Sequence, residues 1–197
     1  MDLNFAVDYI LENDKVLLRP LQLSDFQNLV HFSLNEPALW QYSLQSAAGI
    51  DGLMEYLNAA IKGRSQQREY PFIVFEKEKQ QYAGCTRFYD IQPGNKTMQL
   101  GYTWYGEQFQ GTGINKNCKY LMLQFAFEKL NVERVEFRAD NDNVKSIAAM
   151  KSIGCKVEGV LRSNMAKTNG TRRDSIVLSI LKNEWFEEVK QDLENKL

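Results

Sequence analysis

A glycine-rich turn in the second half of the chain constrains the fold most. Residues 110–115, Gln-Gly-Thr-Gly-Ile-Asn, stand between two regular patterns. Residues 98–104 before the turn are rich in aromatic and β-compatible side chains, which predicts a strand. After the turn, apolar residues recur at helical spacing: Ile114, Cys118, Leu121 and Phe125. Free N–H groups and the dipole at such a helix start attract anions, and glycines let a phosphate approach the backbone. The turn therefore predicts a diphosphate site.

Three known phosphate-binding patterns can be compared with this turn. A P-loop requires lysine and then serine or threonine after its last glycine, but Ile114 and Asn115 follow Gly113. A dinucleotide-binding turn requires a further glycine where this chain has Lys116. The third pattern, Q/R-x-x-G-x-G/A, agrees at Gln110 and Gly113 and departs at Asn115. The hexapeptide by itself fits a plain helix start equally well.

Further motifs follow the turn in order. Residues 140–146, Asp-Asn-Asp-Asn-Val-Lys-Ser, precede an apolar segment that ends at Ile153 and Gly154, which predicts a helix with Asn141 or Asp142 as its N-cap. Residues 157–162, Val-Glu-Gly-Val-Leu-Arg, and residues 170–180 then predict a final hairpin.

These segments together resemble the GNAT N-acetyltransferases, and in particular their RimJ/RimL-like branch, the ribosomal-protein-alanine N-acetyltransferases. The third phosphate pattern is that family's acetyl-CoA pyrophosphate loop. Residues 140–146 resemble the D-N-x-x-S element of the branch, and residues 157–162 resemble its EGxLR strand. The resemblance extends from about Leu17 to Trp185.

The resemblance implies the GNAT acyl-CoA N-acyltransferase fold, a mixed, mostly antiparallel twisted sheet with helices on both faces. The order of the predicted elements, βααβββαβαββ, independently predicts an α+β sheet of this kind. The first strand is expected at residues 15–20, and the first helix is expected to run from a Ser24 cap to about Leu34. Residues 1–14 are interpreted as a lead-in with a short helix. A single GNAT domain spanning residues 1–197 is expected, because no linker or repeat interrupts the chain.

Composition excludes several other classes of protein. The 197 residues carry a net charge of −1, which predicts no attraction to nucleic acid or to a membrane. No apolar run is long enough to span a bilayer. Cys85, Cys118 and Cys155 form no CxxC pair, which predicts neither a metal site nor a disulfide set. A reduced, cytoplasmic location is therefore expected.

The resemblance assigns acetyl-CoA as the cosubstrate, with no metal. Its diphosphate and arm are expected to contact one set of residues: Thr103, Trp104, Gln110, Gly111, Thr112, Gly113, Ile114, Asn115 and Asn143. Lys116 and Lys119 could add positive charge, although a solvated helix face is the favoured interpretation of both.

Acyl transfer also requires groups that move protons. Many GNAT enzymes protonate the leaving thiolate with a tyrosine, but the matching residue here is Met150, so Ser146 or ordered water is expected to take that role. Glu36 is the expected base, with Glu69, Glu107, His31 and water as alternatives. The acceptor pocket is expected to contain four residues: Trp40, Tyr42, Arg87 and Tyr102.

The predicted function is transfer of an acetyl group from acetyl-CoA to a primary amine by direct attack. The resemblance slightly favours a peptide N-terminus over a small amine. The alternative from another class is a non-catalytic acyl-CoA-binding module, for which the departures at Asn115 and Met150 leave room. The sequence leaves the oligomeric state open, including a homodimer.

Overall fold

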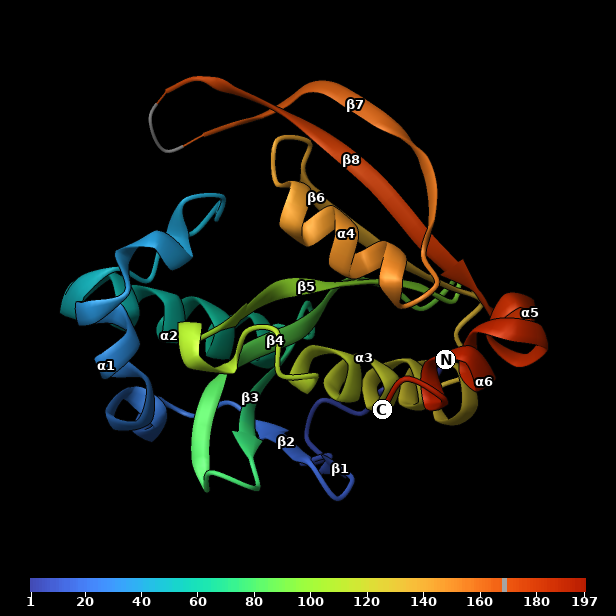
Figure 1. Cartoon of the computed structure of the whole chain (residues 1–197), viewed down its shortest axis with the longest axis horizontal. Coiled ribbons are helices and arrows are strands. Elements are labelled where there is room, and N and C mark those ends of the chain that lie inside the picture. The colour runs from blue at the N-terminus through green and yellow to red at the C-terminus, as the bar shows by residue number, and fades with distance from the viewer. Residues whose placement is uncertain (168–169) are drawn as a thin grey trace.

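One mixed sheet forms the framework of the protein (Figure 1). The structure is a computed structural model that describes residues 1–167 and 170–197. The strands lie in the order β1-β2-β3-β4-β5-β6-β8-β7. Their bounds are β1 Leu11–Glu12, β2 Val16–Pro20, β3 Tyr70–Glu76, β4 Gln81–Gln92, β5 Thr97–Tyr105, β6 Arg134–Asp140, β7 Lys156–Ala166 and β8 Arg172–Leu181. Neighbouring strands are antiparallel, except that β5 and β6 run parallel.

Helices cover both faces of the sheet. The longer ones are α1 Phe26–Asn35, α2 Gly49–Ser65, α3 Ile114–Gln124 and α4 Val144–Ser152, and the C-terminal segment contains α5 Lys182–Glu184 and α6 Lys190–Glu194. Successive side chains of β4 identify the two faces: Arg87 lies over Tyr56 of α2, whereas the neighbouring Thr86 bonds to Lys119 of α3. The mixed α+β sheet that the sequence predicted is confirmed.

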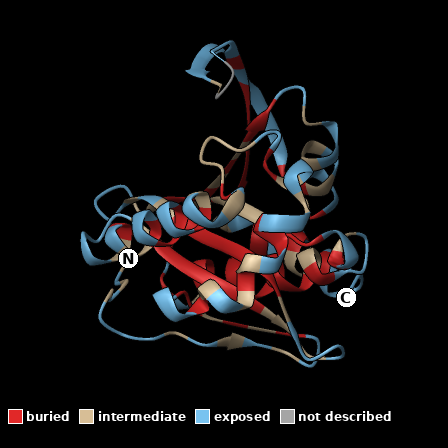
Figure 2. Cartoon of the chain, turned by 90° about the vertical axis from the view of Figure 1, so that its left-hand side faces the viewer, coloured by how far each residue is buried: buried red, intermediate tan, exposed pale blue. Residues whose placement is uncertain are grey.

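The apolar core follows the middle of the sheet, where the buried segments concentrate in Figure 2. The alternating pattern of β6 buries Val135 and Phe137 and leaves Arg134 and Glu136 partly exposed. Every described residue of β7 is exposed. The β7–β8 hairpin extends past α4 and overhangs the central strands (Figure 1).

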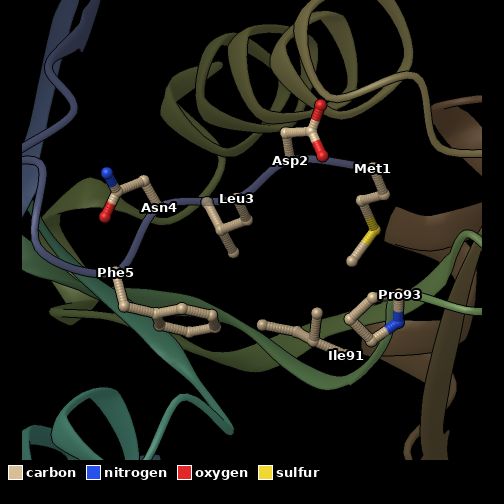
Figure 3. A pocket seen from close by; sticks show the side chains of 7 residues that line it. All are labelled: Met1, Asp2, Leu3, Asn4, Phe5, Ile91 and Pro93. Atoms are coloured by element: carbon tan, nitrogen blue, oxygen red, sulfur yellow. The ribbon is translucent and has the colours of Figure 1, made fainter.

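The N-terminal lead-in does not form the short helix that was expected. Its described residues contain turns and the two-residue β1. The hydroxyl of Tyr70 explains this, because it donates to the Val7 carbonyl at 2.6 Å and accepts from the Tyr9 N–H at 3.0 Å. The segment crosses the end of β4, where residues 1–5 line a cavity of about 320 Å³ with Ile91 and Pro93 (Figure 3).

Two helix starts differ from the predicted caps. A 3₁₀ turn, Leu23–Asp25, precedes α1, and the Asp25 carboxylate, not the Ser24 hydroxyl, accepts the Gln22 N–H at 2.9 Å. In α4 the N-cap is Asn143, whose side chain accepts the Ser146 N–H at 3.0 Å. Asn141 and Asp142 lie outside that helix.

Candidate active site

The separation of two parallel strands creates the main cavity of the protein. β5 and β6 pair only between residues 97–99 and residues 134–136. Beyond this point residues 100–105 and residues 137–140 line opposite sides of a cavity of about 1240 Å³. The facing strand edges have no ladder partner across the gap, so their N–H and C=O groups are available to an extended ligand.

A bulge in β5 shapes the middle of this cavity. Cys85 pairs with Trp104 and Arg87 pairs with Gly101, so both Tyr102 and Thr103 face Thr86. Tyr102 adopts a left-handed conformation with φ +48°, which is costly for a bulky residue. The bulge therefore directs Tyr102 and Thr103 to opposite faces of the sheet, at the point where the strands separate.

Arg87 contacts the bulge from the α2 side of the sheet. It does not line the cavity, contrary to the sequence-based expectation. Its guanidinium carbon lies 4.2 Å from the centre of the Tyr102 ring and 4.8 Å from that of Tyr56. Its Nη1 atom pairs with the Glu69 carboxylate at 2.5 Å. Arg87 is thus a buried contact of the cavity wall, and Glu69 is its counter-ion.

Lys119 of α3 contacts the bulge from the opposite face of the sheet through hydrogen bonds. Its side chain is 5% exposed, so the predicted solvated position is wrong. The Nζ atom donates to the Thr103 hydroxyl at 2.6 Å and to the Thr86 hydroxyl at 3.1 Å, and it has no ion pair within the described residues. Burial without a counter-ion lowers the pKa of Lys119 to about 7. Lys116 also borders the cavity but remains half-exposed.

The glycine turn presents an open start of α3 to the cavity. Gly113 is the N-cap with φ +89°, Gly111 has φ +77°, and no side chain caps the helix. Apart from the adjoining residues, no atom lies within 4 Å of the position that a Cβ would take at either glycine. No side chain caps the first N–H groups of α3 and the glycines before them leave room for a ligand, which fits the diphosphate of CoA.

The polar side chains of the turn maintain its shape. Gln110 donates to the Tyr105 carbonyl at 2.9 Å and accepts from Lys145, which ties the turn to β5 and to α4. Thr112 donates to the Phe109 carbonyl at 2.8 Å. Gln110 and Asn115 border the cavity, but Thr112 and the buried Ile114 do not.

The first turn of α4 forms the opposite wall. Asn143 and Ser146 both border the cavity, as does Met150, which stands where the family has its tyrosine. The Asn143 side-chain oxygen is occupied by capping, whereas the Ser146 hydroxyl has no hydrogen-bond partner among the residues described. A free hydroxyl that borders the cavity is suited to donate a proton or a hydrogen bond.

Aromatic side chains line the end of the cavity nearest α1 and α2. Trp40, Tyr42 and Tyr102, which were expected in the acceptor pocket, border it together with Trp104, which was expected to contact the cosubstrate. The Trp40 and Trp104 rings meet edge to face at 4.9 Å. Both indole N–H groups are buried without a partner in the described part of the chain.

The expected bases are mostly outside the cavity. The Glu36 carboxylate accepts the backbone N–H of Glu107 at 2.7 Å and does not border the cavity. Glu69 pairs with Arg87, and His31 is exposed on α1. Glu107 borders the cavity as an exposed residue, so it is the one carboxylate of that group with direct access.

Two further polar residues of the cavity, Arg173 and Ser175 of β8, were not predicted from the sequence. Both are buried and both border the cavity. Their spacing of two residues places them on one face of a strand, but the same alternation applies to Arg172 and Asp174. Sequence alone does not say which of the two faces is turned inward.

Residues 1–167 and 170–197 contain neither a metal-binding cluster nor a membrane-spanning helix. No cluster of His, Cys, Asp or Glu in these ranges is arranged to hold a metal ion. No helix in them is long and apolar enough to cross a membrane.

Two bacterial proteins are similar to this sequence, one over most of its length and one over about half. The Escherichia coli (strain K12) spermidine N(1)-acetyltransferase is 25% identical over 176 residues, which cover 89% of this chain and 90% of that protein. Bacillus subtilis (strain 168) YdaF, provisionally named a ribosomal N-acetyltransferase, is 32% identical over 102 residues, 52% of this chain and 55% of that protein. The second likeness is consistent with the RimJ/RimL-like branch.

Solved structures and the family description agree with these relatives. A crystal structure from T. thermophilus, provisionally described as an acetyltransferase, has a TM-score of 0.87 and 30% identity, covering 98% of each chain. The description "Acetyltransferase (GNAT) domain" matches residues 15–156, which contain the glycine turn, the bulged strand and α4. The chain therefore belongs to the GNAT family and is an acetyltransferase.

Proposed function

We propose that the protein transfers the acetyl group of acetyl-CoA to a primary amine by direct attack on the thioester. One observation carries the proposal: a single cavity connects the uncapped start of α3 to the separated edges of β5 and β6. The α3 start is suited to the diphosphate through the backbone of residues 111–115. The β5 edge offers N–H groups to the pantetheine arm, and Asn143 contacts the arm from α4. When bound, the cosubstrate supplies the activated carbonyl.

The amine approaches from the side of α1 and α2. The α3 face of the bulge carries Lys119 and Thr103, and the other face carries Tyr102 and the paired indoles of Trp40 and Trp104. In this proposal the cosubstrate arm occupies the gap between the strands and leaves the aromatic side open. Tyr42, which is exposed at this end, marks the entrance.

Two residues handle protons in the proposed reaction. Ser146 hydrogen-bonds the departing thiolate, a role supported by its free hydroxyl beside the cavity. Glu107 replaces Glu36 as the candidate base, since it borders the cavity, whereas Glu36 does not border it and its carboxylate accepts the Glu107 N–H. Attack by the neutral amine forms the C–N bond, collapse breaks the C–S bond, and the proton lost by nitrogen reaches Glu107 or water.

The acceptor is either a peptide N-terminus or a small amine. The relatives described above bear names of both kinds, one ribosomal and one for spermidine. The resemblance to the RimJ/RimL-like branch favours a peptide N-terminus slightly.

Incubation with acetyl-CoA, a peptide library and a panel of small amines tests the proposal. Free CoA is measured with a thiol reagent, and the products are identified by mass spectrometry. We expect one free CoA per N-acetylated product. Binding of acetyl-CoA without release of CoA would show the non-catalytic module, and acetylation of hydroxyls alone would overturn the reaction class.

A further inference from the structure

Arg173 is an unpaired cation in the wall of the cavity. Its side chain lies on β8 and is 6% exposed. It forms no ion pair and no side-chain hydrogen bond within the described residues, and its Nε atom is buried without a partner. A buried guanidinium is costly unless its donors are satisfied, and planar carboxylates satisfy them best.

A second unsatisfied donor lies beside it. Ser175 is two residues further along β8, so both side chains lie on one face of the strand. Ser175 is 1% exposed, its hydroxyl has no partner in the part of the chain that is described, and it too borders the cavity. Arg173 and Ser175 therefore form a pair of donors without an acceptor, which we name the Arg173–Ser175 pair.

The carboxylates that face this pair already have other partners. Asp140 stands opposite Ser175 on β6, but it binds Lys167 at 2.9 Å and accepts the Asp142 N–H at 3.0 Å. Asp90, further along the cavity wall, accepts Gln99 at 2.7 Å. Within residues 1–167 and 170–197, neither carboxylate therefore forms an ion pair or a hydrogen bond with the Arg173 guanidinium.

Strand register places the pair on the acceptor side of the sheet. Paired residues of neighbouring strands point to the same face, so Ser175 shares a face with Asp140, and therefore with Glu136, which lies an even number of residues before Asp140. Glu136 pairs with Gln99 in the parallel ladder, and Gln99 pairs with Tyr89 of β4. Tyr89 lies two residues after Arg87, which packs over Tyr56 of α2. The Arg173–Ser175 pair therefore lies on the α2 face of the sheet, the side from which the amine is proposed to enter.

We propose that the Arg173–Ser175 pair binds a carboxylate of the acceptor. The preferred acceptor then carries a carboxylate a few bonds from its primary amine, either on an acidic peptide side chain or as the carboxyl group of an amino acid. A polyamine offers no carboxylate and brings added positive charge toward Arg173. The inference rests on the proposed function, because it concerns the acceptor of the same reaction.

Matched acceptors that differ by one charge test this subsite. We would compare peptides with Asp or Asn at the second residue, an amino acid with its amide, and spermidine, using CoA release to measure kcat/KM. A charge-assisted pair predicts a preference of about 10-fold to 100-fold for each carboxylate over its amide. The peptide and amino-acid arms separate the two sources of carboxylate.

Substitution of Arg173 tests whether the preference for carboxylate acceptors arises from the Arg173–Ser175 pair. Arg173→Met should lower kcat/KM for the carboxylate acceptors by the same factor, chiefly through KM, and leave the amides and acetyl-CoA affinity unchanged. Arg173→Lys should restore part of the preference. Arg172→Met is the matched control, because it removes the same charge one residue away on an exposed side chain outside the cavity lining.

The outcomes separate this inference from the proposed function. Equal kcat/KM for acid and amide in the unsubstituted protein overturns the subsite and leaves the acetyltransfer standing. If no acceptor releases CoA, the proposed reaction fails, and calorimetric titration of the same acceptors into CoA-loaded protein decides the subsite. Carboxylate selectivity that Arg173→Met abolishes supports it, and equal affinities overturn it.

Discussion

Lys119 shows at the scale of one residue how packing changes the chemistry of a side chain. The sequence pattern of α3 favours a solvated position for Lys119. In the structure the bulge in β5 instead brings the hydroxyls of Thr86 and Thr103 within hydrogen-bonding distance of its Nζ atom. Such a contact depends on the register of β4 and β5, which sequence alone does not specify. The same limit applies to Arg173 and Glu36, whose directions follow from the fold. Gln110, Gly113 and Ser146, in contrast, could be selected from local sequence patterns.

Burial of Lys119 predicts a dependence of stability on pH. Its pKa falls from 10.5 to about 7 in the folded chain, so between these pH values the unfolded chain binds the extra proton. The contribution of Lys119 to stability therefore rises with pH across this window, by up to about 1.4 kcal/mol per pH unit, and is constant below pH 7. Urea denaturation of the unsubstituted protein and Lys119→Met at pH 7, 8 and 9 measures it.

The difference in unfolding free energy between the unsubstituted protein and Lys119→Met separates the effect of Lys119 from that of other titrating groups. We expect the unsubstituted protein to gain stability relative to Lys119→Met as the pH rises from 7 to 9. Lys116→Met, a half-exposed lysine of the same helix, is the control and should give no such trend. Parallel curves for Lys119→Met and the unsubstituted protein would contradict the buried, uncompensated lysine.

Ser146 allows a second test at this scale. Ser146→Ala removes the free hydroxyl that is proposed to meet the thiolate, so turnover should fall by about 10-fold to 100-fold, near the low end for a proton donor, because water can partly replace it. Acetyl-CoA affinity should change little, since Asn143 caps the backbone N–H of residue 146, which the substitution retains. An unchanged kcat with saturating acceptor and rate-limiting chemistry would reduce Ser146 to a helix-start residue.

Element boundaries were predictable where hydrophobic periodicity is strong and less so where caps decide them. The extents of α3 and β6 follow their apolar patterns closely. The starts of α1 and α4 depend instead on which of several neighbouring polar side chains reaches a backbone N–H, and Asp25 and Asn143 take these roles. The bulge in β5 has no local sequence signal, because it requires the mismatch with β4.

The turn before α3 gives the prediction at the scale of an element. Gly113 has φ +89°, so Gly113→Val imposes a left-handed conformation on a β-branched residue, at a cost of about 1–2 kcal/mol, and adds bulk where phosphate is expected. Calorimetric titration should show acetyl-CoA affinity at least about 10-fold weaker. Gly94→Val, in the turn between β4 and β5 and outside the cavity lining, should bind normally. Equal affinities in all three proteins would refute the loop assignment.

At the scale of the whole molecule, the order of elements was enough to predict a mixed sheet with helices on both faces. It was not enough to locate the cavity. That depends on β5 and β6 losing contact after residue 99, on the bulge beside the gap, and on the β7–β8 hairpin, which adds Met165, Arg173 and Ser175 to the lining. These features join residues distant in the chain, so they emerge only when the register of the entire sheet is known.

A crystal structure of the protein with CoA tests the central claim most directly. We predict the diphosphate on the backbone N–H groups of residues 111–115, the pantetheine arm against β5 between residues 100 and 105, and the thiol within hydrogen-bonding reach of Ser146. Density for CoA elsewhere on the protein, with the gap between β5 and β6 filled only by solvent, would contradict the account.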